Sequence, residues 1–286
     1  MALVLARVAF QILVVAPAPG YSRNVGNFGD SRWQASAIEF PASIFMGYTN
    51  ARCLNGCLAT GCVYERRCDL SPDGKHLIYF AMNGRWESSV KGSWTAISRA
   101  PYLKAVSLFA KGDCWHGGGL FQTSTDYWLN DGHGHELQKE DRRLRRVVEY
   151  PWHEQYGGEC LGVYYIRLQR DGWKLKRSAP DGEGRQVSVF EKRVNNHWIL
   201  RKRAHISIGH SVGRGVYFDT HELFNSRTEE MISKMDWEWA ELDGARLIWA
   251  ANGCLHSGRL DAKGLRSEKL LYDFSSMQFE KLAAPY

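Results

Sequence analysis

The stretch S-P-D-G-K-H-L-I-Y-F-A-M-N-G-R-W, from Ser71 to Trp86, reads as a turn, a strand and a second turn. Proline, aspartate and glycine at its start are residues that favour chain reversal. In the strand that follows, successive side chains point to opposite faces of a sheet. We therefore expect a turn at Ser71–Gly74 between two antiparallel strands. Leu77 and Tyr79 are expected on one face, and Ile78 and Phe80 on the other.

The same scheme recurs further along the chain. Leu242–Leu260 contains D-G, a basic residue, an apolar strand and then N-G. Both dipeptides are strong hairpin signals between apolar strands, because both central residues of the turn must take positive φ. Ala105–Asp113 and Val163–Leu175 are weaker copies. Each is expected to be a short strand that ends in a glycine-containing turn.

These repeats resemble those of WD-like β-propellers, especially the periplasmic Tol-type family, in which the S-P-D-G turn joins neighbouring strands of one blade. The likeness is close over Cys68–Trp86, fair over Trp237–Leu260 and faint elsewhere. At about 40–50 residues per blade, it implies an all-β fold, a single β-propeller of five or six four-stranded blades. One domain, residues 1–286, is expected. Propellers serve many functions, so the resemblance implies architecture and no particular activity.

A propeller ring must pair its two ends. The apolar N-terminal stretch Ala2–Val15 and the C-terminal stretch Leu270–Phe274 are expected to share a sheet or to lie in adjacent blades. The N-terminal stretch also resembles a secretory signal peptide, although Gln11 interrupts it and Arg7 is its only charge. We favour a buried strand. It is too short to cross a bilayer, so no membrane association is expected.

The composition predicts a folded, β-rich protein. Of the 286 residues, 44% are hydrophobic and 24% are charged, which argues against disorder. Eleven tryptophans and thirteen tyrosines suit pleated sheets, and 28 glycines suit many turns. Seven cysteines, an odd number, favour reduced thiols and a cytoplasmic protein, with secretion or a periplasmic location as the alternative.

Short apolar runs between turn residues predict further strands. They are Ala42–Tyr48, Ser93–Ser98, Gly119–Ser124, Asp126–Asn130, Gln186–Val194, His197–Arg203 and Gly215–Asp219. Helix is expected at two places only, Glu229–Met235 and His135–Val148. In the second, Leu137, Leu144 and Val148 recur at near-helical spacing.

Four of the seven cysteines lie close together, at Cys53, Cys57, Cys62 and Cys68. The spacing C-x3-C-x4-C-x5-C lacks the C-x2-C pair that is typical of structural zinc sites, and iron–sulfur runs also use other gaps. We favour packed, incidental thiols and no cofactor. A zinc or iron–sulfur site through three or four of these residues is the alternative, and a disulfide is a third possibility.

Two loops carry candidate binding residues. Lys111–Phe121 places Asp113, Trp115 and His116 beside three glycines, which permit close backbone approach to a ligand. The alternative is a wide turn with a packed tryptophan, and WD-type blades also use a buried Asp and His to bond across strands. The second loop, Asn130–Glu136, offers Asp131, His133, His135 and Glu136, with metal binding as the alternative to a plain loop.

Two other patterns suggest chemistry more weakly. G-H-S-V-G puts Ser211 in the position of a hydrolase nucleophile, but a strand is expected after it instead of the required helix, so we favour a hairpin turn. Basic runs occur at Asp141–Arg146, Arg170–Arg177 and Arg201–His205, and the formal net charge is +6. Solvated basic faces are favoured, with nucleic-acid binding as the alternative.

Because no complete catalytic set is visible, we predict a non-enzymatic recognition or scaffold module that acts in a protein complex. A metal-binding propeller with a possible enzymatic role is the second hypothesis. A nucleic-acid-binding propeller is the third.

Overall fold

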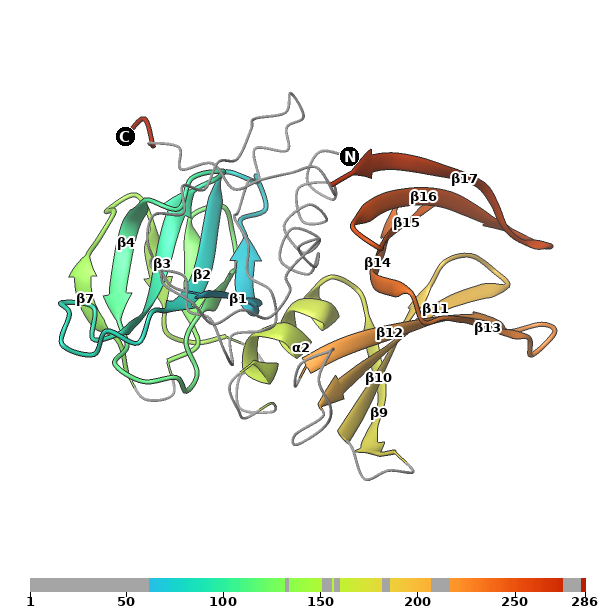
Figure 1. Ribbon diagram of the computed structural model, residues 1–286, viewed down its shortest axis with the longest axis horizontal. Helices are drawn as coiled ribbons and strands as arrows, with labels where there is room; N and C mark the ends of the chain where they lie inside the picture. The colour runs from blue at the N-terminus through green and yellow to red at the C-terminus, as the bar shows by residue number, and fades with distance from the viewer. Residues whose placement is uncertain are drawn as a thin grey trace, which may run out of the picture. The chain divides into compact units, whose positions relative to one another are not determined.

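A computed structural model describes residues 62–131, 134–150, 156, 160–181, 186–206, 217–274 and 284–286 (Figure 1). Strands dominate these residues and pair mainly antiparallel, which confirms the all-β class. The chain divides into two compact units, described over 62–170 with 284–286 and over 171–274. The single propeller domain stays a prediction. The expected strands Ala2–Val15 and Ala42–Tyr48 lie outside the described residues.

The main sheet of the first unit contains five antiparallel strands. They are β1 (Cys62–Leu70), β2 (His76–Met82), β3 (Ser93–Arg99), β4 (Ala105–Ala110) and β7 (Glu136–Lys139), in the order β1-β2-β3-β4-β7 (Figure 1). The first four follow one another in the chain as an up-and-down meander. The predicted strands at 93–98 and 105–110 are confirmed.

The predicted turn joins β1 to β2. The Gly74 N–H donates to the Ser71 carbonyl (2.8 Å), and Gly74 has a φ of +73°. The buried Ser71 hydroxyl accepts the His76 N–H (2.9 Å) and donates to the Asp73 carboxylate (2.7 Å). The turn is therefore held by one buried hydroxyl, which bonds both a backbone N–H and a carboxylate.

A second, smaller sheet lies in the same unit. It contains β5 (Gly119–Phe121), β6 (Asp126–Leu129) and β8 (Arg145–Val147), and β6 and β8 run parallel. The predicted helix over His135–Val148 is wrong, because this segment forms β7, a turn and β8. Pairing of β7 with β4 and of β8 with β6 outweighs the helical spacing of the leucines.

The faces of β2 pack as the alternating pattern predicts. Leu77 and Tyr79 belong to one core cluster on the main sheet. Ile78 belongs to another, where it meets Phe121 and Tyr127 of the smaller sheet. The main sheet is thus buried on both faces, which explains the uninterrupted apolar run of β2.

One helix, α2 (Leu161–Arg170), covers the smaller sheet. Its Val163 and Ile166 pack with Leu120 and Trp128. The strand expected from residue 163 onward is therefore wrong, although its valine, tyrosines and isoleucine favour β structure. Tertiary burial outweighs that preference. Within the described residues, no helix is long and apolar enough to cross a membrane.

The second unit begins with a five-stranded antiparallel meander. Its strands are β9 (Lys174–Pro180), β10 (Gln186–Arg193), β11 (Trp198–Ile206), β12 (Tyr217–Asn225) and β13 (Met231–Lys234). The helix expected at Glu229–Met235 is wrong. Its central residues form β13, which hydrogen-bonds to β12.

A four-stranded meander follows in the same unit. Its strands are β14 (Trp237–Asp243), β15 (Arg246–Ala251), β16 (Cys254–Asp261) and β17 (Gly264–Asp273). The N-G prediction is confirmed, because Asn252 and Gly253 form the loop between β15 and β16 with φ of +53° and +75°. This is the mirror-image turn that tight hairpins require.

Candidate functional site

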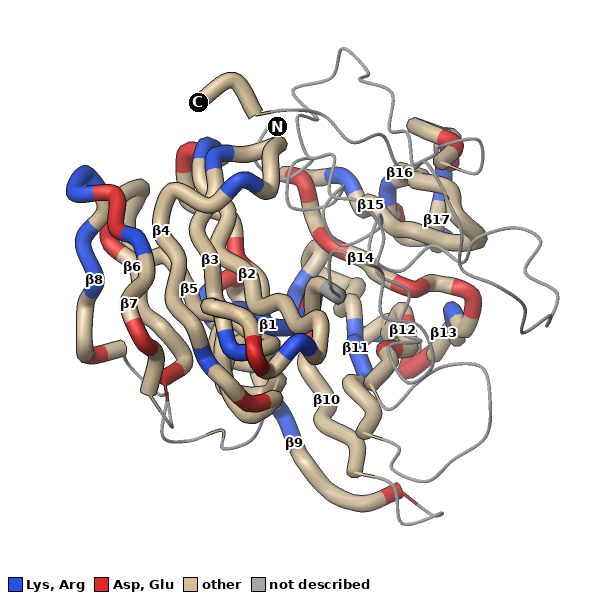
Figure 2. The backbone as a smooth tube through the Cα atoms, turned by 60° about the vertical axis from the view of Figure 1, so that its left-hand side comes forward, with Lys and Arg blue, Asp and Glu red and all other residues tan. Residues whose placement is uncertain are grey.

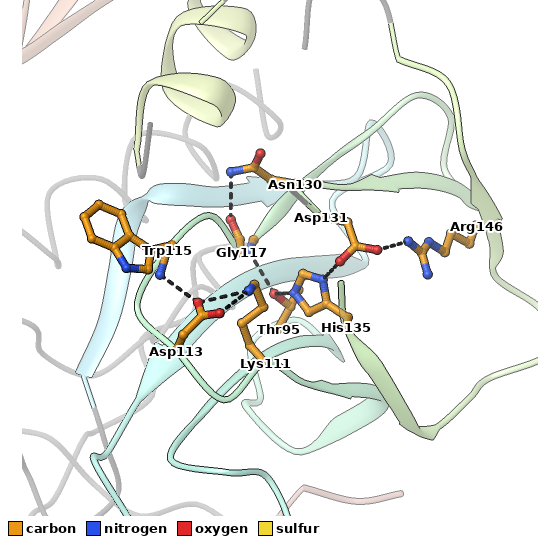
Figure 3. Close-up of polar contacts among 10 residues, drawn as sticks. Thr95, Lys111, Asp113, Trp115, Gly117, Asn130, Asp131, His135 and Arg146 are labelled. Carbon is orange, nitrogen blue, oxygen red and sulfur yellow. Dashed lines mark hydrogen bonds and ion pairs between the residues drawn. The ribbon is translucent and has the colours of Figure 1, made fainter. Parts of the chain in front are cut away.

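The loop after β4 carries Asp113, Trp115 and His116, and an ion pair between a buried lysine and Asp113 organises it. The Lys111 ammonium bonds both Asp113 carboxylate oxygens (2.9 and 2.8 Å), and its side chain is fully buried (Figure 3). The same carboxylate accepts the Trp115 N–H (2.8 Å), while Ser93 donates to the Asp113 carbonyl (2.6 Å). The loop is thus held rigidly, and Trp115 remains 55% exposed.

The three glycines of this loop are needed for close packing inside the protein. A Cβ on Gly118 would lie 2.0 Å from the Arg67 carbonyl oxygen. One on Gly117 would meet the Phe80 ring at 2.3 Å, and one on Gly119 would meet a backbone oxygen of β6 at 2.1 Å. These close approaches are to the chain's own atoms, which matches the wide-turn interpretation of the loop.

His135 belongs to a separate buried chain of hydrogen bonds, shown in Figure 3. Its Nε2 lies 2.8 Å from the Thr95 hydroxyl, and its Nδ1 bonds the Asp131 carboxylate. Arg146 donates to the other oxygen of Asp131, and the Gly118 N–H donates to Thr95 Oγ1 (2.8 Å). The chain links β3, the β4–β5 loop, the segment before β7, and β8.

The order hydroxyl, imidazole, carboxylate is that of a catalytic triad. An ionised carboxylate only accepts, so His135 Nδ1–H donates to Asp131, and Nε2 forms a hydrogen bond with the Thr95 hydroxyl. Burial acts to raise the pKa of Asp131, but hydrogen bonds from His135 and Arg146 outweigh it and lower the pKa. Thr95 is fully buried, and both ring nitrogens of His135 are engaged. The set therefore serves to hold strands together, and we call Thr95, His135 and Asp131 the brace.

Sequence reasoning singled out His135 but missed its partner Thr95 and the arginine, Arg146, that bonds Asp131. Thr95 stands in an ordinary strand pattern, and Arg146 lies in a basic run, so neither carried a recognisable signal. The structure brings Asp113, Trp115 and His116 together on one loop, with His135 in a separate network. His133 lies outside the described residues, and the binding role of all five stays a prediction.

Of the four clustered cysteines, Cys62 and Cys68 lie in β1. Cys68 is fully buried in the core cluster of Leu77 and Tyr79, and its thiol donates to the Tyr64 carbonyl (2.9 Å). Burial raises the pKa of this thiol well above its usual value, which favours the protonated form. Cys68 therefore occupies the packed position that the incidental-thiol interpretation expects.

The metal hypothesis for the whole cysteine set stays open. Cys53, Cys57 and the side chain of Cys62 lie outside the described residues. Among the residues with described side chains, no group of three or more His, Cys, Asp or Glu is arranged to hold a metal ion. This finding covers only that part of the chain and leaves a site formed with earlier residues untested.

The residues just before Cys68 form a bulge that sequence reasoning missed. β1 pairs with β2 at Tyr64 and again at Asp69, so residues 65–68 leave the ladder. Arg67, which is 1% exposed, stacks over the Phe80 ring (4.6 Å) and donates to the Cys114 (2.8 Å) and His116 carbonyls. The bulge thereby ties β1 to the loop that carries Trp115.

Two arginines of α2 also bond the bulge and the residue after it. Arg167 donates to the carbonyls of Glu65 (3.2 Å) and Cys68. Arg170 forms a bidentate pair with the buried Asp69 carboxylate (2.6 and 2.9 Å), which also accepts the Phe121 N–H (2.8 Å). Burial acts to raise the pKa of Asp69, but the Arg170 charge and hydrogen bonds outweigh it, so the pKa is lowered.

The basic runs are largely matched by carboxylates. The ion pairs are Arg143–Asp141, Arg145–Asp126, Arg146–Asp131, Arg201–Glu191 and Arg203–Glu222. Lys202 is buried with its ammonium 3.6 Å from Asp219. Figure 2 shows the basic and acidic segments interleaved along the described backbone. These pairs match the solvated-face interpretation, and nucleic-acid binding stays a prediction.

Comparison with known proteins adds no assignment: no protein-family model matches the chain, and no curated protein is significantly similar to it. The candidate nucleophile Ser211 lies outside the described residues.

Proposed function

We propose that the protein is a non-enzymatic recognition module of the β-propeller type that works in a protein complex. Three groups of strands support this architecture, since β1–β4, β9–β13 and β14–β17 each form an antiparallel meander in chain order. Successive meanders are the units from which propellers are built. In this proposal the ring closes through Ala2–Val15 and the C-terminal strand that contains Leu270, and the protein is cytoplasmic without a cofactor.

The main support for the recognition role is the burial and hydrogen bonding of Thr95 in the triad-like set. Thr95 is buried, and its oxygen already accepts the Gly118 N–H. A nucleophile must reach its substrate, whereas this hydroxyl serves to bind β3 to the loop beside it. The bond from Asp131 through His135 to Thr95 crosses strands as the structural Asp–His bonds of WD-type blades do.

A brace of this kind suits a module that presents loops on a rigid frame. It anchors the glycine stretch of the β4–β5 loop from one side, and Arg67 holds the same loop from the other. Trp115 is exposed to solvent on an ordered backbone. Binding of a partner to it therefore costs little further conformational entropy. Rigid aromatic side chains are typical anchors of protein interfaces.

Two measurements test the proposal. Cross-linking of the full chain in its own cells, followed by reconstitution from purified components, should yield a stoichiometric complex by calorimetry. The enzyme alternative predicts turnover of model esters that Thr95→Val abolishes and Thr95→Ser retains. Thr95-dependent turnover, or failure to reconstitute any complex, would contradict the recognition role.

The other two hypotheses have their own tests. Stoichiometric zinc or iron in the purified full chain, lost in Cys57→Ser, would establish the metal-binding alternative. Oligonucleotide binding that weakens steeply with added salt would establish the nucleic-acid alternative.

A further inference from the structure

One end of the main sheet of the first unit exposes large apolar side chains. The cross-strand pairs place Met82 opposite Ser93, and Ala110 opposite Glu136, at this end. Trp86, in the β2–β3 loop, is 49% exposed, and Trp115 is 55% exposed. Leu137, on β7, is 53% exposed. We call Trp86, Trp115 and Leu137 the apolar end surface.

The indole of Trp86 forms a fixed platform. A Cβ on Gly92 would lie 2.5, 2.8 and 3.0 Å from three adjacent atoms of this ring, so one ring face rests on the Gly92 backbone. The residue still exposes 49% of its surface, so part of the indole is accessible to a ligand. A flat, supported aromatic face is suited to stacking against proline, aromatic rings or peptide planes.

The segments that carry these side chains are joined to one another. The Lys111 N–H donates to the Ser93 carbonyl (2.9 Å), which ties the Trp115 loop to the strand after Trp86. Lys91 bonds Glu136 at the start of β7 (2.5 Å). The segments that carry the three apolar side chains are therefore linked to one another at this end of the sheet.

We propose that the apolar end surface binds an extended segment of another protein through proline, leucine or aromatic side chains. This inference rests on the proposed recognition function and names the chemistry of its partner. Neighbouring strands are about 4.8 Å apart, so the surface from the β2–β3 loop to β7 is roughly 10–15 Å wide. An extended chain rises about 3.3 Å per residue and crosses it with roughly four residues.

The charges around the surface favour an uncharged, apolar ligand. Arg85 and Lys91 are exposed there, and Glu87 and Glu136 balance them. A nucleic acid needs an excess of positive charge, and these described residues of the rim show no such excess. Exposed apolar patches rimmed by polar residues are characteristic of protein interaction sites.

The test uses the full chain and a library of displayed random dodecapeptides. Enriched peptides should carry proline, leucine or aromatic residues at two or more positions. Labelled synthetic copies should lose at least about tenfold in affinity for Trp115→Ala and for Trp86→Ala, as expected for tryptophan anchors. The control Val148→Ala removes another exposed apolar side chain, from the segment after β8, and should bind like the wild type.

Fluorescence anisotropy measures the affinities, and equal thermal melting curves establish that the variants are folded. Trp86→Phe, which keeps a ring over Gly92, should retain more affinity than Trp86→Ala. No enrichment, or peptides that bind both alanine variants normally, would overturn the proposal. Tryptophan-dependent binding of cellohexaose or of a thymidine oligonucleotide would overturn the proposal in favour of another ligand class. Dimerisation that depends on concentration and is lost in Trp115→Ala would overturn it in favour of a second copy of this chain. A reconstituted complex that survives both alanine variants would remove this surface while leaving the recognition function intact.

Discussion

The two units of the molecule both bury cations among β-strands, but they stabilise them by different means. In the first unit, the guanidinium groups of Arg167 and Arg170 bind backbone carbonyls and the Asp69 carboxylate. In the second, the Lys202 ammonium lies 5.0 Å from the centre of the Trp173 ring, with Asp219 as its nearby carboxylate. Guanidinium satisfies several acceptors in one plane, whereas an ammonium is a compact charge.

A buried histidine completes the second arrangement. His221 is opposite Lys202 in the ladder between β11 and β12, and its Nδ1–H donates to the Trp237 carbonyl (2.9 Å). Burial, followed by the Lys202 charge, lowers the pKa of His221 to about 3. The first unit therefore depends on keeping its hydrogen-bond partners, and the second depends on His221 staying neutral.

Asp69→Asn should produce the largest effect. It removes the charge that Arg170 pairs with, and breaking a buried pair typically costs about 3–5 kcal/mol. Urea denaturation of the full chain should show this loss in the free energy of unfolding. The matched control, Asp126→Asn, breaks the surface pair with Arg145 and should change stability far less. Equal effects of the two variants would show that the first unit does not depend on its buried pair.

The second unit should instead respond to pH. The pKa of His221 is lower when folded than the ordinary 6.5, so the unfolded chain binds the extra proton more readily. Its contribution to stability is present above pH 6.5 and is lost as the pH falls, by about 2 kcal/mol at pH 5. In the first unit, His76 of β2 also has a pKa lowered by burial, so that unit has a titrating group that acts in the same direction.

Urea denaturation between pH 8 and pH 5 measures this loss. In His221→Asn, the amide can still donate to the Trp237 carbonyl but does not titrate, so the pH dependence should become shallower. An unchanged slope in this variant would assign the acid sensitivity to other groups.

The turns of the two units are also stabilised by different means, a side-chain hydrogen bond in the first unit and backbone conformation in the second. The Ser71–Gly74 turn is held by a buried hydroxyl, so Ser71→Ala leaves the His76 N–H without its side-chain acceptor. A loss of about 1–2 kcal/mol is expected in the free energy of unfolding. The exposed Ser89 provides the control, and Ser89→Ala should be close to neutral. A neutral Ser71→Ala would show that backbone bonds alone hold this turn.

The smallest effect is expected at the N-G turn of the second unit. Asn252 has a φ of +53°, which disfavours alanine by about 1 kcal/mol. Thermal unfolding should show this loss for Asn252→Ala, whereas Asn252→Gly accepts the same φ and should stay near the wild type. Similar losses for both variants would assign the effect to the asparagine side chain and not to backbone conformation.

The elements that sequence predicted best are those determined by neighbouring residues. The Ser71–Gly74 turn, the alternation of Leu77 and Ile78, and the Asn252 turn all follow from local backbone and side-chain preferences. Cys68 also fits the packed position expected for an incidental thiol, because a small thiol is easily buried between strands.

The elements that were predicted wrongly depend on distant partners. Val163–Arg170 has strand-forming residues but is helical, because Val163 and Ile166 are buried on the smaller sheet while Arg167 and Arg170 reach β1. Glu229–Met235 has helix-forming residues but contains β13, because β12 supplies hydrogen-bond partners. Propensity differences are below about 1 kcal/mol per residue, so burial and pairing override them.

By itself, the sequence determined the all-β class, the Ser71–Gly74 and Asn252 turns and the faces of β2, because these depend on contacts between residues close in the chain. Only the tertiary structure brought Thr95, Asp131 and His135 into one brace and joined Arg170 to Asp69. These partners are separated by up to 101 positions in the chain. Their pairing depends on the packing of the sheets and the helix. A buried charge or hydroxyl is stabilised only where this packing places a partner within hydrogen-bond distance.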